Sequence, residues 1–242
     1  MKILGIIPAR LASTRFPAKP LVDIGGTSMV MRTFRQAQKC PLLADVVVAT
    51  DDQGIFDHVV ANSGKVVLTR TNHDTGTSRC AEVQQQMPHF DACINIQGDE
   101  PFISPNQISA VAQLLIKGAE IATLAKPDSN RESLMETSAV KVVLNHKNEA
   151  MLFSRSLIPF VREYSDSRTY TWLRHVGIYG YRADILKQLV TLPTAPPEQY
   201  ESLEQLRWMY NGYKIEVGLT DEDSHSIDTP ADLERVKKHF GY

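Results

Sequence analysis

Three cations follow an apolar run near the N-terminus and lie within ten residues of one another. The run Ile3–Ala9 leads directly into a loop that carries Arg10, Arg15 and Lys19. Guanidinium and ammonium groups supply the donors and the positive charge that a triphosphate requires. Ligands of open α/β sheets bind just outside the carboxyl ends of the strands. The loop therefore predicts a phosphate site, and the alternative is a solvated basic loop.

Carboxylates emerge at another predicted strand end. In the segment Asn95–Pro101, which reads NIQGDEP, Gly98 lets the backbone turn sharply before Asp99 and Glu100. Protein sites for Mg²⁺ commonly combine one or two carboxylates with substrate phosphates. Asp99 is therefore a candidate Mg²⁺ ligand, although a turn with solvated acids is the alternative. Asp228 is a second candidate, and a structural residue at a helix entry is nearly as good an interpretation of it.

Other polar residues are weaker candidates. The loop His73–Arg79, which reads HDTGTSR, has amides and hydroxyls that can hold a ribose, a base or a sugar acid, but an ordinary capped loop is the alternative. Asp51 and Asp52 follow a strand and can pair with cations of the N-terminal loop, without a role in metal binding. His175, at the edge of a strand-like segment, is by itself more typical of a structural histidine.

Length and composition limit the class of protein. A chain of 242 residues with 43% hydrophobic residues suits one large domain, here 1–242. The formal net charge of −2 gives no global field for nucleic acid, so the clustered cations must serve something local. Cys40, Cys80 and Cys93 form no CxxC pair, so neither a zinc site nor a disulfide framework is indicated, and a reducing cytoplasm fits.

Several common classes are disfavoured. Gly25–Ser28 lacks the lysine of a Walker loop, and no G-x-G-x-x-G follows the first strand. A P-loop ATPase and a Rossmann dehydrogenase are therefore both unsupported. The N-terminal apolar run is too short for a signal peptide or a membrane span, so we expect no membrane partner.

Short apolar runs alternate with amphipathic segments over the first half of the chain. This alternation predicts βαβ units and a mainly parallel sheet. The predicted strands are Ile3–Ile7, Val46–Thr50, Lys65–Thr69, Ala92–Gln97 and Ile121–Ala125. The predicted helices are Met29–Gln38, Gln53–Asn62, Arg79–Gln86 and Pro105–Lys117.

The pattern changes after about residue 138. Ala139–Leu144 and Ala150–Ser154 predict a hairpin, and the whole inserted region spans about 139–182. The polar stretch Arg162–Thr169 is predicted to be a mobile excursion. The further predictions are a strand over Val176–Arg182, a helix near Tyr200–Tyr210, a strand near Ile215–Leu219 and a terminal helix capped by Thr229.

The chain resembles the 3-deoxy-manno-octulosonate (Kdo) cytidylyltransferases, the CMP-Kdo synthetase family of Gram-negative bacteria. The similarity runs from end to end in the family's order, which makes it more specific than any one motif. The matching strings are IIPARLASTRFPAKPLVDI (6–24), ATDD (49–52), HDTGTSRCAEV (73–83), NIQGDEPFI (95–103), AVKVVL (139–144), FSRSLIPF (153–160), RHVGIYGYR (174–182), LEQLRWMYNGYKI (203–215) and DTPADLERV (228–236).

The resemblance implies a nucleotide-diphospho-sugar transferase-like α/β fold, with a mixed, mainly parallel central sheet flanked by helices and an appended β-hairpin used for dimerisation. It implies the reaction CTP + Kdo → CMP-Kdo + diphosphate, with Mg²⁺ as cofactor, in the cytoplasm and for lipopolysaccharide biosynthesis. The expected partners are CTP, Kdo and a second copy of the chain.

The resemblance also implies a role for each matching residue. The catalytic residues would be Arg10, Lys19, Asp99 and Asp228, with Asp99 and Asp228 holding the Mg²⁺. The nucleotide would be bound by Arg10, Arg15, Lys19, Thr77, Arg79 and Gln97. The sugar would be bound by Gln97, Arg155, His175, Tyr179, Glu204 and Gln205, with Arg155 gripping the sugar carboxylate.

Two positions depart from the family's usual pattern. Ala18 stands where the family usually has Gly, and it is strained if the position needs a positive φ. Ser78 stands where the family usually has Glu, and a carboxylate lost beside Arg79 can alter the sugar preference.

Three other functions remain to be distinguished. A cytidylyltransferase for a related acid sugar, such as the 8-amino analogue of Kdo, is the nearest. A non-catalytic nucleotide-sugar-binding module is the second, although mere binding needs no pair such as Asp99 and Asp228. An oxidoreductase is the third, and the missing dinucleotide fingerprint argues against it.

Overall fold

The computed structural model describes residues 1–11, 16–165 and 169–242. These residues form a nine-stranded mixed sheet with the strand order β3-β2-β1-β4-β8-β5-β9, and β6 and β7 lie off this path. The strands are β1 (Ile3–Ala9), β2 (Asp45–Thr50), β3 (Val66–Leu68), β4 (Ala92–Asn95), β5 (Ile121–Asp128), β6 (Lys141–Leu144), β7 (Ala150–Ser154), β8 (Trp172–Arg182) and β9 (Glu216–Leu219).

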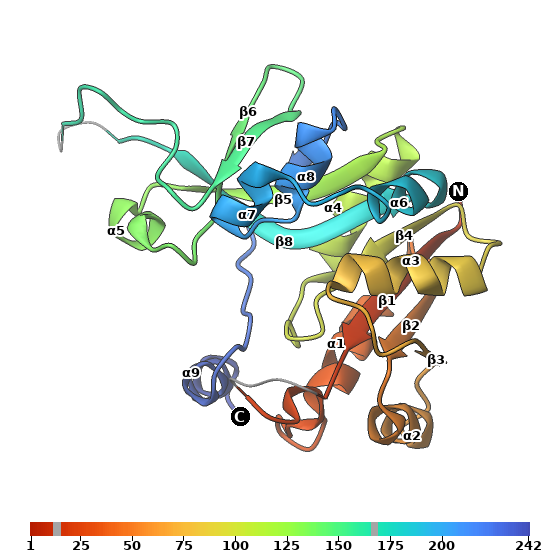
Figure 1. Ribbon diagram of the computed structural model, residues 1–242. Coiled ribbons are helices and arrows are strands. Elements are labelled where there is room, and N and C mark those ends of the chain that lie inside the picture. The colour runs from red at the N-terminus through yellow and green to blue at the C-terminus, as the bar shows by residue number, and fades with distance from the viewer. Residues whose placement is uncertain (12–15, 166–168) are drawn as a thin grey trace.

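Helices cover both faces of this sheet (Figure 1). They are α1 (Met29–Ala37), α2 (Gln53–Ala61), α3 (Gly76–Gln86), α4 (Pro105–Ile116), α5 (Arg131–Met135), α6 (Ala183–Leu189), α7 (Pro196–Glu201), α8 (Gln205–Tyr210) and α9 (Pro230–Phe240), with a short 3-10 helix η1 (Lys19–Leu21). One apolar cluster lies between the sheet and α1 and α4, and a second lies between the sheet and α3, α6 and α8.

The parallel half of the sheet contains β3, β2, β1 and β4. β1 is buried along almost its whole length, which is typical of a parallel strand covered on both faces. The carboxyl ends of β1, β2 and β4 therefore meet at one edge, and the loops that carry Arg10, Asp51 and Gln97 leave the sheet there.

The other half is antiparallel around β8, which pairs with both β4 and β5 in the opposite direction. β5 and β8 are each longer than the apolar patterns predict, because the pairing continues to Asp128 and Trp172 beyond the apolar segments. β6 and β7 form an antiparallel hairpin, and β6 pairs with β8 at Lys141 and Arg174.

The helix predicted over Tyr200–Tyr210 is two helices, α7 and α8. Ser202 ends α7 in the left-handed conformation, with φ 50°, and the chain changes direction before α8 begins. The sequence patterns did not predict α5, α6 or α7, each of which has seven residues or fewer. The excursion predicted over Arg162–Thr169 lies partly outside the described residues.

After β9 the chain runs without helix or strand from Thr220 to Thr229, which we call the strap. Figure 1 shows the strap descending from the sheet to α9. The amide of Ile227 donates to the carbonyl of Asp99 at 2.9 Å, so the strap is fixed next to the QGDEP loop.

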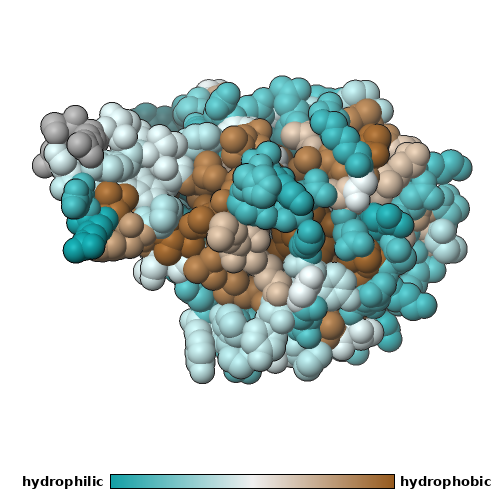
Figure 2. All heavy atoms as spheres, turned by 90° about the horizontal axis from the view of Figure 1, so that it is seen from above, coloured by the Kyte–Doolittle hydropathy of each residue, from teal (hydrophilic) through white to brown (hydrophobic). Residues whose placement is uncertain are grey.

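The surface has exposed apolar residues around the hairpin. Met151, Leu152 and Phe160 are all exposed. Figure 2, seen from above Figure 1, shows hydrophobic side chains open to solvent on this face. In the described part of the chain, no helix combines the length and apolar content needed to cross a membrane.

Candidate active site

A cavity of about 500 Å³ opens at the carboxyl ends of β1 and β4. It is lined by the ends of the two strands, by η1 and the start of α1, by the loop before α3 with the start of that helix, and by the end of the strap. Its polar lining comprises Arg10, Lys19, His73, Asp74, Thr75, Arg79, Gln97, Asp99 and Asp228. The structure thus brings the predicted phosphate loop and both predicted metal ligands to one cavity.

Lys19 lies between the two predicted metal ligands. Its Nζ donates to Asp99 Oδ2 at 2.8 Å and to Asp228 Oδ1 at 3.3 Å. It also donates to the carbonyl of Ile227 at 3.0 Å. Three oxygen atoms from two distant parts of the chain therefore converge on one cationic group.

Gly98 explains how Asp99 reaches this position. A Cβ at Gly98 would lie 2.7 Å from the carbonyl oxygen of Pro8, so only glycine lets the QGDEP turn pass so close to β1. Glu100, the other acid of this turn, points away from solvent and accepts from Ser224 Oγ at 2.7 Å. Burial raises the pKa of Glu100 to about 7. Only Asp99 of the two acids therefore lines the cavity.

Asp228 is fixed by the start of α9. Thr229 and Asp232 form a capping box, and the amide of Asp228 donates to Asp232 Oδ2 at 3.2 Å. Asp228 can therefore be both a helix-entry residue and a metal ligand, because the same capped turn presents its carboxylate to Lys19.

Ala18 has the positive φ under which the sequence analysis predicts a strained residue. Ala18 has φ 53° and ψ 26°, the left-handed conformation that favours glycine. This residue directly precedes η1, so its conformation sets the direction in which Lys19 leaves the backbone. Arg10 lines the cavity, whereas Arg15 lies outside the described residues.

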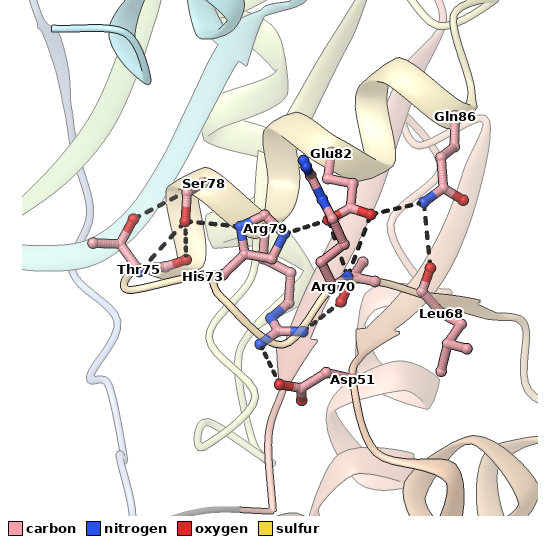
Figure 3. Close-up of polar contacts among 10 residues, drawn as sticks. Asp51, Leu68, Arg70, His73, Thr75, Ser78, Arg79, Glu82 and Gln86 are labelled. Atoms are coloured by element: carbon pink, nitrogen blue, oxygen red, sulfur yellow. Dashed lines mark hydrogen bonds and ion pairs between the residues drawn. The ribbon is translucent and has the colours of Figure 1, made fainter.

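Arg79 pairs with a carboxylate that the sequence analysis did not assign to it. Its guanidinium pairs with Asp51 Oδ2 at 3.2 Å and donates to Thr69 Oγ1 (Figure 3). Figure 3 shows that Arg79 extends from α3 toward Asp51, while Ser78 faces the other way. The carboxylate beside Arg79 is therefore supplied by Asp51, and the absence of Glu at position 78 leaves Arg79 paired.

Ser78 instead forms a capping box with Thr75 and lies 3.2 Å from Nδ1 of His73. The other ring nitrogen of His73 contacts the Glu82 carboxylate, which also accepts from Arg70. Burial alone would raise the pKa of Glu82, but the hydrogen bonds from His73 and Arg70 outweigh it and lower that pKa. This network fixes the loop that forms one wall of the cavity.

Glu204 lies beneath the same loop. It accepts from Thr77 Oγ1 at 2.7 Å and from Thr75 Oγ1 at 3.1 Å. Burial raises the pKa of the Glu204 carboxyl, although both hydroxyls act against this effect. The hydroxyl of Thr77 is thus directed to Glu204, and Thr77 is itself buried.

Tyr179 on β8 and Gln205 at the start of α8 are buried, and His175 on β8 is half-buried. The His175 Nε2 lies 3.1 Å from Thr123 Oγ1, and burial lowers the pKa of His175 to about 3, so its ring is neutral. The Tyr179 ring contacts Trp208 edge-on. None of these three side chains lines the described cavity.

Arg155 follows β7 and lies against α7. Its Nε donates to the carbonyl of Glu201 at 2.6 Å, its Nη1 to that of Thr137 at 2.8 Å, and its Nη2 to that of Ser202 at 3.3 Å. The structure therefore fixes Arg155 to backbone carbonyls, outside the lining of the cavity.

A second cavity, of about 680 Å³, shares Arg10, His73 and Arg79 with the first. Asp51 and Asp52 lie in its lining. The two cavities adjoin across a cationic boundary. This provides more space than a triphosphate alone requires.

The donor set fits a hard divalent cation. Carboxylate and carbonyl oxygens are the ligands that Mg²⁺ prefers, and the Lys19 ammonium marks a point where Asp99, Asp228 and the Ile227 carbonyl meet. The residues that the structure describes contain no group of three or more His, Cys, Asp or Glu side chains suited to a metal. Further ligands would have to come from water or from a substrate.

A mixed sheet with a cationic cavity and a carboxylate pair at its parallel edge suits a nucleotidyltransferase. The chain belongs to the cytidylyltransferase family, whose sequence model matches residues 4–215. It is 48% identical to the 3-deoxy-manno-octulosonate cytidylyltransferase of Parabacteroides distasonis, over 98% of this chain and 97% of that protein.

Two further comparisons agree. The chain is 47% identical to the 3-deoxy-manno-octulosonate cytidylyltransferase of Bacteroides thetaiotaomicron, over 98% of each chain. It is 40% identical to CMP:2-keto-3-deoxy-manno-octonic acid synthetase, solved in complex with CTP, with a TM-score of 0.94 over 100% of this chain and 99% of that one. The expected family and the α/β fold with a mixed central sheet flanked by helices are confirmed.

Proposed function

We propose that this protein transfers the cytidylyl group of CTP to Kdo, releasing diphosphate and forming CMP-Kdo for lipopolysaccharide biosynthesis. The observation that carries the proposal is the convergence of Lys19, Asp99 and Asp228 on one cavity that Arg10 also lines. Full-length similarity to proteins named for this activity supports the choice of both substrates.

The chemistry needs no nucleophile from the protein. The anomeric hydroxyl of Kdo attacks the α-phosphorus of CTP in line, the new P–O bond forms as the bond to the β-phosphate oxygen breaks, and diphosphate leaves with its electron pair. The protein's tasks are positioning and charge stabilisation. Lys19 and Arg10 would offset charge on the phosphoryl oxygens, and Gln97 would orient a substrate from the strand end.

We propose that Asp99 and Asp228 hold a Mg²⁺ ion. When bound, this ion would neutralise phosphate charge and lower the pKa of the attacking hydroxyl. The oxygen-rich donor set around Lys19 supports this assignment.

Arg155 is proposed to grip the carboxylate of Kdo. A guanidinium has five N–H donors, and the three backbone carbonyls take one each, which leaves two for a carboxylate. The proposed sugar site also includes His175 and Glu204, which are half-buried, and Tyr179 and Gln205, which are buried, so binding would have to open it.

We further propose a homodimer formed through the hairpin, in the cytoplasm. Exposed Met151 and Leu152 on β7 would be covered by a two-fold partner. The three cysteines, all free and buried, suit a reducing compartment.

The test is diphosphate release with CTP against each of the other three nucleoside triphosphates, with and without Kdo. We expect release only with CTP and Kdo together. The 8-amino analogue, used in parallel, identifies the sugar: a higher kcat/KM for the analogue would assign the chain to that substrate. No release with either sugar would leave a binding module.

A further inference from the structure

The three N–H donors of the Lys19 ammonium are used by the two carboxylates and one backbone carbonyl. An ammonium has three N–H groups, and Asp99 Oδ2, Asp228 Oδ1 and the Ile227 carbonyl accept them. The Lys19 and Asp99 side chains are only 16% and 26% exposed, so solvent screens this pair less than a surface ion pair. The ammonium is therefore held at the point where the oxygens converge.

A divalent ion at that point would meet a like charge. The ammonium already contacts Asp99 Oδ2 and Asp228 Oδ1, at N–O distances of 2.8 and 3.3 Å. Two positive groups so close repel strongly. A metal ion and the Lys19 ammonium therefore exclude each other from the carboxylate pair.

The protein also offers few ligands of its own. Mg²⁺ takes six oxygen ligands in near-octahedral geometry. The described residues contain no third acidic or imidazole side chain that would complete a metal cluster with Asp99 and Asp228. A bare ion therefore gains little here to offset the loss of the Lys19 pair.

A bound triphosphate would change both the position of the Lys19 ammonium and the number of ligands available to a metal ion. Lys19 itself lines the cavity, and its flexible four-carbon stem can turn its ammonium toward phosphate oxygens in that cavity. The phosphates would also supply the metal ligands that the protein lacks. The same ligand thus removes the competing cation and completes the site.

We propose that Lys19 occupies the metal position in the nucleotide-free protein, and that the divalent ion enters only when the triphosphate of the nucleotide draws the ammonium away. This inference rests on the proposed function of the site. Lys19 would then couple metal binding to nucleotide binding, in addition to stabilising negative charge during the reaction.

The experiment measures Mn²⁺ binding to the nucleotide-free protein by electron paramagnetic resonance. We expect the Lys19→Met variant to bind one Mn²⁺ at least roughly tenfold more tightly than wild type, since a charge interaction of about 1.4 kcal/mol corresponds to that factor. Lys65→Met is the matched control, because it removes an ammonium paired with Asp45 at 2.7 Å elsewhere on the protein. Its Mn²⁺ affinity should equal that of wild type.

The double variant Lys19→Met/Asp228→Asn locates the gained site. Loss of the tight Mn²⁺ supports the proposal, whereas its retention would show a site elsewhere and overturn it. Equal Mn²⁺ affinity of wild type and Lys19→Met also overturns it, and Lys19→Gln replaces Lys19→Met if thermal unfolding shows that the latter is not folded. Diphosphate release by wild type is measured separately, so failure of the proposed function is distinguished from failure of this inference.

Discussion

Asp99 and Asp228 are the residues on which the proposed metal role depends most directly. Replacing either carboxylate with Asn removes a charge while keeping the shape, so Asp99→Asn and Asp228→Asn should each lower kcat about 10²-fold or more and leave the fold intact. Steady-state diphosphate release and circular dichroism check both statements. Asp184→Asn, which alters an exposed pair with Arg182, is the control. Near-normal turnover of both site variants at saturating Mg²⁺ would refute the assignment.

Arg155 tests the sugar half of the site. Lysine cannot reproduce the two parallel hydrogen bonds of a guanidinium to a carboxylate, so Arg155→Lys should raise KM for Kdo by roughly tenfold and leave KM for CTP nearly unchanged. Initial rates with each substrate varied in turn measure the two constants. Arg182→Lys should change neither. Equal effects of Arg155→Lys on both KM values would indicate that Arg155 acts only through the backbone carbonyls it binds.

At the scale of elements, the loop between β1 and η1 stores strain at Ala18. A left-handed alanine costs about 1 kcal/mol or more. Glycine removes this cost, but its greater conformational entropy in the unfolded chain cancels part of the gain in stability. Ala18→Gly should therefore raise the free energy of unfolding by roughly 0.5 kcal/mol, as measured by urea denaturation. Ala61→Gly in α2 should have the opposite sign, because glycine is a poor helix former. Destabilisation by Ala18→Gly would contradict the strain.

The pairing of β5 with β8 buries the neutral ring of His175 and makes the fold sensitive to acid. Burial lowers the pKa of His175 to about 3, whereas it titrates near 6.5 when unfolded. Between these values the unfolded chain binds a proton that the folded chain does not. The free energy of unfolding should therefore fall by about 1.4 kcal/mol per pH unit below about pH 6, through this group.

The measurement compares urea unfolding of wild type and His175→Gln at about pH 7 and about pH 5. The variant should lose less stability between the two than wild type does. Glu100, whose pKa is raised to about 7, works in the opposite direction in both proteins and cancels in the comparison. His146→Gln, on the exposed turn after β6, is the control. An unchanged pH dependence in His175→Gln would contradict the buried neutral ring.

At the scale of the whole molecule, the hairpin β6–β7 predicts assembly. An isolated hairpin is marginally stable in water, and the exposed Met151 and Leu152 need a cover. The protein should therefore run as a dimer of ~54 kDa, twice the 27.1 kDa chain, in gel filtration with light scattering.

Charges on this face should break the dimer. The double variant Met151→Glu/Leu152→Glu should give the mass of one chain, since two carboxylates cannot be buried unpaired in an apolar interface. Val60→Glu, at an exposed apolar residue of α2, should leave the mass unchanged. A wild-type monomer at micromolar concentration would refute the dimer.

The sequence by itself determined the local features. The apolar runs predicted the core of each principal strand, and Thr229 predicted a helix start, because capping depends on neighbouring residues alone. The departure from the family's usual Gly identified Ala18 as strained if left-handed. End-to-end motif matches then gave the family.

Only the tertiary structure decided which side chains meet. Lys19 and Asp228 are 209 residues apart, and their contact depends on where the strap crosses the QGDEP loop. Asp51 became the partner of Arg79 because parallel pairing brings β2 and the loop before α3 to one edge. The antiparallel direction of β8 and the break at Ser202 likewise follow from packing. Local propensity carries no information on such long-range pairings, since they are fixed by strand order and core packing rather than by adjacent residues.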